Sequence, residues 1–250
     1  MSLRVIARLD LKNQFLIKGI NLEGLRKIGN PNEFAYEYYL DGIDEIIFID
    51  IVASLYERKN LINVIKSASN NIFIPLTAGG GIRSIADAKS LFNSGADKIC
   101  INTAAVKNPK ILKNLSEEYG SQSIVLGIET KLINNNWEIY YDNGREKTGI
   151  KTVEWIEEAL SYGIGEILLT SIDKEGTKKG FDIKLLEDIG KISSVPIIIS
   201  GGMGSLSHLD KIVKIDSLSA IAIASNLHYK DYKVSEIKKY LLNLGANVRI

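Results

Sequence analysis

The sequence has few cysteine and histidine residues, and each shortage limits what the protein can do. Of 250 residues only Cys100 is a cysteine, so no internal disulfide can form and a reducing compartment, the cytoplasm, is expected. The two histidines, His208 and His228, are far apart and have no ligand spacing with the cysteine. We therefore predict no metal site and no cofactor.

Charge of one sign and long apolar runs are also lacking. The net charge of +1 gives no general electrostatic reason to bind nucleic acid or an anionic membrane. No apolar run reaches about 18 residues, and the chain does not start with a basic segment followed by an apolar one, so neither a membrane span nor a signal segment is expected. What the chain does have is 45% hydrophobic residues, enough for a large buried core.

The chain repeats itself at half its length. GIDEIIFIDI at 42–51 matches GIGEILLTSI at 163–172, and IPLTAGGG at 74–81 matches VPIIISGG at 195–202 at the same offset. VIARLDLK at 5–12 and IVLGIETK at 124–131 match at nearly that offset. Three matches in one order predict a duplicated half, with half-units of roughly 1–120 and 121–250.

Apolar runs rich in isoleucine and valine alternate with helix-like stretches. Such runs are typical of parallel strands buried on both faces. The predicted strands are 4–9, 45–50, 72–77, 97–102, 124–128, 166–171, 195–199 and 219–224. Helix-like stretches such as 32–42, 84–95 and 152–163 start near polar caps and end at glycine.

Eight strand and helix units predict an α/β fold, a (β/α)8 TIM barrel with a half-barrel repeat, formed by residues 1–250 as a single domain. A doubly wound open sheet is the structural alternative, but it would not explain the repeat. Segment 131–149 is predicted to be a short hairpin with a DNG turn, inserted after the fifth strand.

Two of the matching strands end in an acid, Asp10 in one half and Glu129 in the other. Residues at the carboxyl ends of barrel strands point into the catalytic mouth, and the first and fifth strands of eight lie opposite each other. Two facing carboxyl groups can protonate one side of a substrate and deprotonate the other. Alternatively, each acid caps the next helix or pairs with a nearby lysine.

Glycine-rich turns follow the third and seventh strands, TAGGGIRS at 77–84 and ISGGMGSL at 199–206. Backbone amides at the start of a helix favour an anion, so each turn can receive a phosphate. Thr103 and Ser225, after the next strand of each half, can complete two cradles. The pair predicts a substrate with a phosphate at both ends, although glycines in a turn can also serve a tight bend alone.

These stretches together resemble the cyclase subunit of imidazole glycerol phosphate synthase (the HisF family) over essentially the whole chain. The resemblance is carried by RLDLK, IKGINLEGLRKIGNP, DEIIFIDI, TAGGGI, GADKICINTAA, GSQSIV, TGI, GEILLTSIDKEGTKKGFD, ISGGMG and the C-terminal GANVRI. The GINLEGLR segment and the C-terminus resemble the cyclase more than its sibling isomerase. The resemblance implies an enzyme, a lyase and cyclase, that uses ammonia from a HisH-like glutaminase subunit. The implied reaction converts a bisphosphorylated ribulosyl formimino aminoimidazole carboxamide ribonucleotide to imidazole glycerol phosphate and aminoimidazole carboxamide ribonucleotide.

The resemblance also implies roles for individual residues. Asp10 and Glu129 match the two catalytic acids. The substrate and phosphate positions are Lys18, Gly80, Gly81, Asn102, Thr103, Thr170, Ser171, Glu175, Gly176, Gly201, Gly202, Ala224 and Ser225. At the opposite, N-terminal face the family has a charged gate for ammonia, matched here by Arg4, Glu45, Lys98 and Glu166. The gate implies a glutaminase docked at that face, whereas salt bridges that close the barrel bottom are the purely structural interpretation.

Three positions depart from the family pattern. Glu129 and Glu175 stand where the family has aspartate, which moves each carboxyl group by one methylene, about 1.5 Å. Arg8 stands where the family has a small residue, on the same side of its strand as Asp10. A guanidinium there is expected to lower both carboxyl pKa values and can narrow the ammonia path, unless Arg8 points elsewhere or pairs with Glu45.

These departures leave an alternative function open. A diverged paralogue would dock a glutaminase and channel ammonia to another acceptor, such as an acetamidino sugar of a surface glycan. A freestanding isomerase is a third interpretation. Among weaker candidates, Cys100 is expected to pack in its strand, His228 to cap a helix or lie on the surface, and Trp137, Tyr140 and Tyr141 to cover the mouth or stabilise their hairpin.

Overall fold

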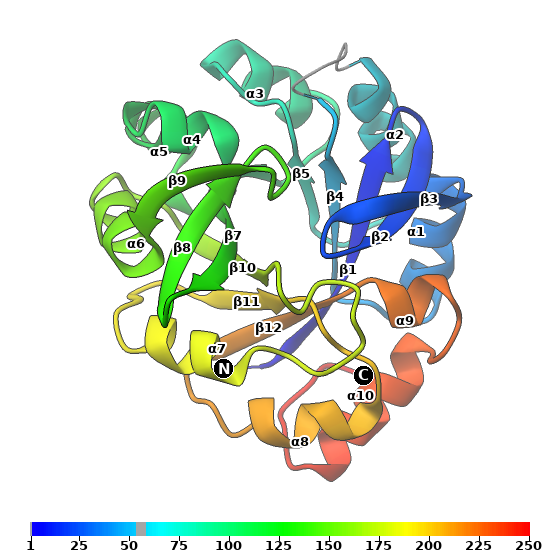
Figure 1. Cartoon of the computed structure of the whole chain (residues 1–250). Coiled ribbons are helices and arrows are strands. Elements are labelled where there is room, and N and C mark those ends of the chain that lie inside the picture. The colour runs from blue at the N-terminus through cyan, green and yellow to red at the C-terminus, as the bar shows by residue number, and fades with distance from the viewer. Residues whose placement is uncertain (1, 54–58) are drawn as a thin grey trace.

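Eight parallel strands pair around a complete ring in the computed structural model, which describes residues 2–53 and 59–250 (Figure 1). The first and last strands of the ring pair with each other, and the fifth pairs with the sixth, so no edge is left open. The ring strands are β1 (Arg4–Lys12), β4 (Glu45–Asp50), β5 (Leu76–Gly79), β6 (Lys98–Ile101), β7 (Ile124–Ile133), β10 (Glu166–Ser171), β11 (Ile197–Ser200) and β12 (Leu218–Ile223). The prediction of a TIM barrel is confirmed, and the open-sheet alternative is wrong.

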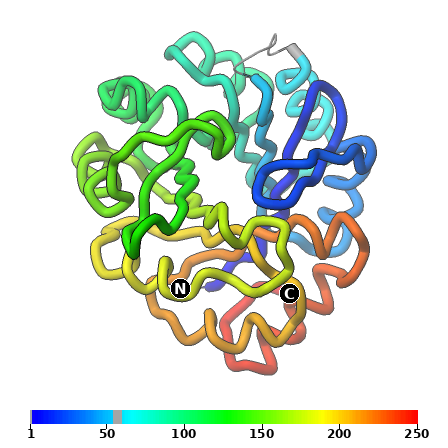
Figure 2. Tube along the Cα trace, in the orientation of Figure 1, coloured from blue at the N-terminus to red at the C-terminus, as the bar shows by residue number. Residues whose placement is uncertain are grey.

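Helices surround the ring and cover its outer face (Figures 1 and 2). Isoleucine, leucine and valine side chains of both layers form one large core between strands and helices. The helices are α1 (Pro31–Leu40), α2 (Lys59–Ser69), α3 (Ile85–Phe92), α4 (Thr103–Lys107), α5 (Lys110–Tyr119), α6 (Thr152–Ser161), α7 (Ile183–Gly190), α8 (Leu209–Ile212), α9 (Ser225–His228) and α10 (Val234–Asn243), with 3-10 turns η1 (Ser121–Ser123) and η2 (Leu206–His208). Within the described residues, no helix is long and apolar enough to cross a membrane.

Two of the three quoted helices begin at the predicted kind of cap. The Asn30 side chain accepts the backbone N–H of Asn32 at the start of α1, and the Ser84 side chain accepts that of Asp87 at the start of α3. Both helices, and α6, end shortly before a glycine with positive φ.

Prolines shift two strands from their predicted positions. The predicted strands 72–77 and 195–199 begin at Leu76 and Ile197, each directly after a proline. Proline has no N–H to donate to a ladder, but its carbonyl can accept. Pro75 accepts from the backbone of Ile46 at 3.1 Å and Pro196 accepts from that of Ile167 at 3.0 Å, so pairing starts at the proline carbonyl.

We call the rim formed by the carboxyl ends of the ring strands the mouth. Two hairpins extend from these strand ends and flank the mouth (Figure 1). The first consists of β2 (Phe15–Ile20) and β3 (Glu23–Gly29), and pairs with the end of β1. In the second, β7 continues past the ring and pairs with β8 (Asn136–Tyr141), which pairs with β9 (Glu146–Lys151). The predicted hairpin exists, but its DNG turn joins β8 to β9. The β2–β3 hairpin is absent from the prediction.

Side chains alternate along each ring strand, so every second residue points into the barrel. The middle of the interior is apolar and consists of Ile6, Ile47, Cys100, Val125, Leu168, Ile198, Ala220 and Ala222. Cys100 packs in this layer, as predicted. Charged and polar side chains lie on either side of the apolar layer, at the mouth and at the N-terminal face.

Candidate active site

Asp10 and Glu129 stand on opposite walls of the mouth. Asp10 lies one residue before the last ring pairing of β1, and Glu129 lies one residue before that of β7. These strands are the furthest apart that two strands of the ring can be. Both residues continue the inward-facing rows of Ile6 and Val125. Duplication of the strand pattern therefore places one carboxyl group at each side of the same opening.

Arg8 lies on the inward row of β1, directly below Asp10, and is only 3% exposed. Its Nε donates to Oδ1 of Asp10 at 2.9 Å. Its Nη1 donates to the hydroxyl oxygens of Thr170 at 2.8 Å and Ser200 at 3.2 Å, which reach in from β10 and β11. Arg8 therefore points into the barrel and pairs with Asp10, and the alternative pairing with Glu45 is wrong.

The pKa values of the two carboxyl groups are shifted in opposite directions. Burial raises the pKa of Asp10, but the positive charges of Arg8 and Lys18 outweigh burial and hold the pKa below its usual range. Burial raises the pKa of Glu129 to about 7, against the opposing effects of Arg8 and of the Gly144 N–H. Arg8 therefore lowers both pKa values, as expected, but it outweighs burial only at Asp10, to which it bonds directly; at Glu129 it acts through space and burial prevails.

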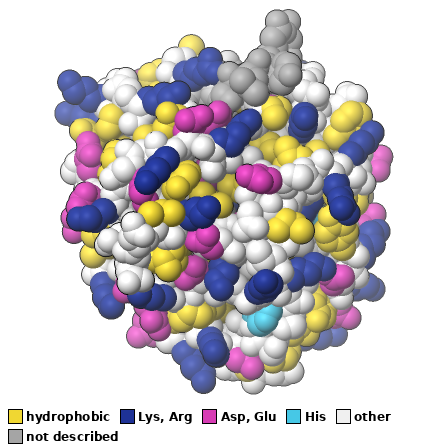
Figure 3. All heavy atoms as spheres, in the orientation of Figure 1, with side chains coloured by type: hydrophobic (Ala, Val, Ile, Leu, Met, Phe, Trp, Pro, Cys, Tyr) yellow, Lys and Arg dark blue, Asp and Glu magenta, His cyan; other side chains and the backbone are white. Residues whose placement is uncertain are grey.

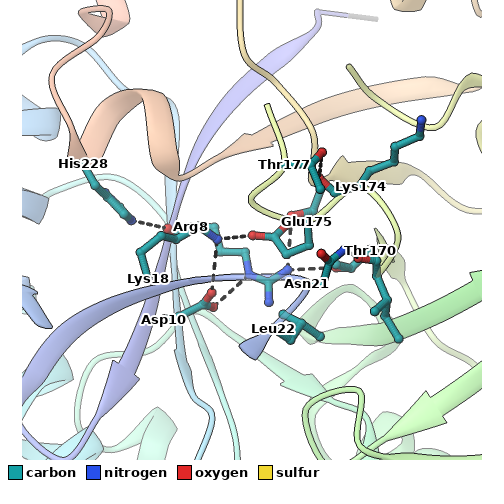
Figure 4. A network of polar contacts seen from close by, with 12 residues as sticks. Arg8, Asp10, Lys18, Asn21, Leu22, Thr170, Lys174, Glu175, Thr177 and His228 are labelled. Carbon is teal, nitrogen blue, oxygen red and sulfur yellow. Dashed lines mark hydrogen bonds and ion pairs between the residues drawn. The ribbon is translucent and has the colours of Figure 1, made fainter. Parts of the chain in front are cut away.

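Lys18 and Glu175 form a buried ion pair that closes one side of the mouth (Figure 4). Lys18 comes from β2 and Glu175 from the segment between β10 and α7, and they are 4% and 3% exposed. The Lys18 Nζ also lies 3.9 Å from Oδ2 of Asp10. The Asn21 backbone N–H donates to the Glu175 carbonyl, and the Asn21 side chain donates to the Ile172 carbonyl. These bonds hold the β2–β3 hairpin against the segment that follows β10.

A cavity of about 550 Å³ opens on the Glu129 side of the mouth. Its lining includes Arg8, Glu129 and Thr170. It also includes the four residues of the first predicted cradle: Gly80, Gly81, Asn102 and Thr103. Gly80 and Gly81 have φ values of 99° and 67°, and a Cβ at Gly80 would lie 2.1 Å from the Asp50 carbonyl oxygen, so glycine is required there. Arg83 and Lys107 bring positive charge to the same cavity.

The second predicted cradle has the same backbone geometry. Gly201 and Gly202 have φ values of 94° and 104°. A Cβ at Gly201 would lie 2.8 Å from a carboxylate oxygen of Glu175, and one at Gly202 would lie 2.1 Å from the Gly180 carbonyl oxygen. The turn is therefore packed against the segment after β10, at Glu175 and Gly180. α9 starts beside it at Ser225, with Ala224 as the N-cap residue. Both halves therefore carry a glycine turn at the equivalent place.

Neighbouring Thr170 and Ser171 point to opposite sides of β10. Thr170 faces the cavity, where its hydroxyl accepts from Arg8. The Ser171 hydroxyl donates to Oδ2 of Asp182, whose other oxygen caps the N-terminus of α7. The Ser171 side chain thus lies outside the mouth, contrary to its assignment as a site residue, because strand alternation turns it outward.

A closed ring of alternating charges spans the N-terminal face of the barrel. Arg4 Nη1 lies 2.6 Å from Glu45, and its Nη2 bonds to Glu166. Lys98 Nζ closes the ring at 3.2 Å from Glu45 and 2.9 Å from Glu166. The side chains of Arg4 and Lys98 are 23% and 20% exposed, so the charged ring is accessible from this face. The four residues matched to the ammonia gate therefore form a single structure.

Several residues near the mouth are absent from the predictions. Asp50 lines the cavity, and burial raises its pKa. The sequence carries a signal for it, because its strand, like β1, is an apolar run that ends in an acid. The Gly144 N–H, in the β8–β9 turn, donates to Oε2 of Glu129 at 2.8 Å.

Across the face of the molecule seen in Figure 3, basic and acidic side chains are mixed.

His228 is buried, contrary to the expected surface or capping position. Its Nδ1 accepts from the Tyr38 hydroxyl at 2.8 Å and its Nε2 donates to the Arg8 carbonyl at 3.1 Å. Burial and the charge of Lys18 lower the pKa of His228 to about 4, so the ring is neutral and supports the backbone of β1. Trp137 is also buried and packs in the outer core, which fits its expected role in the hairpin.

Comparison with known proteins gives one consistent family. A family model described as histidine biosynthesis protein matches residues 4–233. A curated relative from Legionella pneumophila, imidazole glycerol phosphate synthase subunit HisF, is 53% identical over 84% of this chain and 99% of its own length. Proteins of the same name are 42% identical over 99% of the chain and 98% of their own length in Sulfurisphaera tokodaii, and 43% identical over 100% and 99% in Thermococcus onnurineus. The chain therefore belongs to the HisF family of histidine biosynthesis proteins.

Proposed function

We propose that the chain is the cyclase subunit of imidazole glycerol phosphate synthase in histidine biosynthesis. It uses ammonia to convert a bisphosphorylated ribulosyl formimino aminoimidazole carboxamide ribonucleotide to imidazole glycerol phosphate and aminoimidazole carboxamide ribonucleotide. The observation that carries this function is the pair of opposing carboxyl groups whose pKa values are shifted apart.

The pair divides the proton transfers between its members. Asp10 is ionised at neutral pH and takes protons from the attacking nitrogen, while Glu129, with a pKa of about 7, delivers protons to the departing oxygen. Groups on opposite walls reach opposite sides of one substrate. Glu129 is therefore an effective replacement for the family's aspartate, because burial supplies the protonated form that a general acid needs.

The substrate's two phosphates bind in the two glycine turns. Gly80 and Gly81, with Asn102 and Thr103, receive one phosphate, and the lysine and arginine of the same cavity, Lys107 and Arg83, add attraction. Gly201 and Gly202, with Ala224 and Ser225, receive the other. Lys18, Glu175 and Gly176 cover the second site, and Thr170 lies between the two.

The ammonia comes from a HisH-like glutaminase docked at the N-terminal face. The charged ring of Arg4, Glu45, Lys98 and Glu166 supports this docking face, because it is accessible and lies at the end of the barrel opposite the mouth. We place the complex in the cytoplasm, in keeping with a single buried thiol at Cys100. The two halves of the barrel, roughly 1–120 and 121–250, are duplicated units of one domain.

The test is turnover of the purified chain with the bisphosphorylated substrate and a high ammonium concentration, which replaces the glutaminase. We expect cyclised product, and a loss of turnover of about 10²- to 10⁴-fold in Asp10→Asn and Glu129→Gln. Glu117→Gln, the same change at an exposed carboxyl group, serves as the control and should keep wild-type turnover.

A chain that binds a glutaminase but never turns over this substrate would exclude the cyclase function. That result would point to the diverged paralogue that passes ammonia to a different acceptor. The comparisons do not favour this alternative, because the relatives named above carry the synthase name.

A further inference from the structure

The buried guanidinium of Arg8 has donors that the protein does not use. Nε and Nη1 donate to Asp10, Thr170 and Ser200. Among the described residues, Nη2 has no hydrogen-bond partner, and in Figure 4 one terminal nitrogen of the group carries no dashed line. A guanidinium has five N–H donors, so two remain for another molecule.

Arg8 lies at the cavity on the Glu129 side of the mouth. Arg8 is 3% exposed, yet it belongs to the lining of the 550 Å³ cavity together with Glu129 and Thr170. Nη2 is not among the fully buried side-chain atoms without a partner, so an oxygen of water in the free protein, or of a bound molecule, can accept from it. Arg8 bonds to Asp10 and shares the cavity with Glu129, so a molecule in the cavity can contact both Arg8 and the acid.

The local charges decide which oxygen fits. Arg8 and Lys18 are balanced by Asp10 and Glu175, which contact them directly, and Glu129 stands nearby. A carboxylate or phosphate at Nη2 would add an anion next to three acidic side chains. A neutral carbonyl oxygen meets no such repulsion, and it gains from the guanidinium as negative charge develops on it.

We propose that Nη2 of Arg8 donates a hydrogen bond to the carbonyl oxygen of the acceptor that ammonia attacks. The inference rests on the proposed use of ammonia at this site and adds a catalytic residue to it. As the nitrogen lone pair forms the new C–N bond, the C=O electron pair moves onto oxygen, which Arg8 stabilises. Two protons then leave nitrogen through Asp10 and two reach oxygen through Glu129, so that water departs and no net proton is consumed.

Arg8→Lys tests this assignment, because it keeps the positive charge beside Asp10 but removes the planar fork. With ammonium supplied, we expect kcat to fall by about 10²- to 10³-fold. The acidic limb of the pH profile should stay in place, since the charge is retained, whereas in Arg8→Met it should move to higher pH. Arg249→Lys, the same change at an exposed position, is the control.

A binding measurement without ammonia keeps the inference independent of turnover and of variant folding. By calorimetry, the wild-type protein should bind the ketone substrate about tenfold more tightly than its reduced, alcohol form. This preference should vanish in Arg8→Lys. Equal affinity of the wild type for both forms, or an unchanged preference or kcat in a folded Arg8→Lys, would overturn the role of Arg8. An Arg8-dependent preference without any turnover would uphold Arg8 and overturn the cyclase function instead.

Discussion

At the scale of single residues, the two acids of the mouth differ because their nearest neighbours differ. Asp10 has a guanidinium at 2.9 Å and an ammonium group at 3.9 Å. Glu129 has a neutral amide, the Gly144 N–H, at 2.8 Å. Burial is common to both, so the charge of the partner decides which carboxyl group is ionised at neutral pH.

This difference predicts a pH dependence of stability that belongs to Glu129. Its pKa is about 7 in the folded protein, whereas an exposed glutamate has a pKa of about 4.5. The folded state therefore holds a proton that the unfolded state has lost between these pH values, and the free energy of unfolding should fall as the pH rises from about 4.5 to about 7. Denaturant unfolding at a series of pH values measures this slope.

Glu129→Gln isolates the contribution, because the amide resembles the protonated acid and does not titrate. The free energy of unfolding of the variant should lack this fall. The variant should therefore gain stability relative to the wild type as the pH rises from about 4.5 to about 7. Identical slopes for the two proteins between these pH values would mean that Glu129 is ionised in the folded state, and its role as general acid would have to be abandoned.

Sequence reasoning identifies residues at strand ends but not their partners. Asp10 and Glu129 can be found because each ends an apolar run. Asp50 follows the same rule but does not stand out, because its counterpart in the other half is a serine, Ser171, and not an acid. The partners of Arg8, Thr170 and Ser200, lie more than a hundred residues away along the chain, so only the closed barrel brings them together.

At the scale of elements, the β2–β3 hairpin controls access to Asp10. The cleft beside Asp10 is lined by Lys18, Gly19, Leu22 and Glu175 and has a volume of only about 10 Å³. The hairpin must therefore open before a substrate reaches this acid. The hairpin is hard to predict from sequence because glycines interrupt its alternation, and because its turn holds Asn21 and Leu22 at positive φ, which is unusual for leucine.

Gly176→Ala should release this hairpin. Gly176 has a φ of 71°, and a Cβ there would lie 2.3 Å from the Gly19 carbonyl oxygen, so the hairpin has to move away. We expect faster tryptic cleavage at Arg26 and Lys27 in β3, which are exposed, and a raised KM for the substrate. Limited proteolysis under native conditions measures the opening.

Gly149→Ala provides a matched control for the backbone strain. Gly149 has a φ of 78°, but a Cβ there would meet nothing within 4 Å. Both variants should lose about 1–2 kcal/mol of stability from the left-handed conformation, and only Gly176→Ala should open the hairpin. Equal cleavage rates in the two variants would show that the contact with Gly19 does not hold the hairpin closed.

At the scale of the whole molecule, closure of the barrel joins residues that the sequence keeps apart. Glycine turns with positive φ values at both glycines follow β5 and β11, which is what a duplicated half predicts. The charged ring is duplicated only in part: Glu45 and Glu166 stand at equivalent positions of the two halves, whereas Arg4 and Lys98 both come from the first half. The ring therefore depends on the complete barrel.

A double-mutant cycle measures how strongly the ring couples the two halves. Lys98→Met and Glu166→Gln each leave an excess of one charge among partly buried groups. We expect each single change to lower the free energy of unfolding by about 1–3 kcal/mol, and the double change to show a coupling energy of about 0.5–3 kcal/mol. Urea unfolding of the four proteins gives these values.

The exposed pair of Lys113 and Glu117 on α5 is the control, with side chains 61% and 65% exposed. Its coupling should be a few tenths of a kcal/mol, because water and salt screen it. The ring coupling should exceed it and persist at high salt, since Glu45 and Glu166 are only 8% and 6% exposed. If both couplings were equally small, the ring would not close the barrel. Its charges would then serve the N-terminal face, where the ammonia source is proposed to dock.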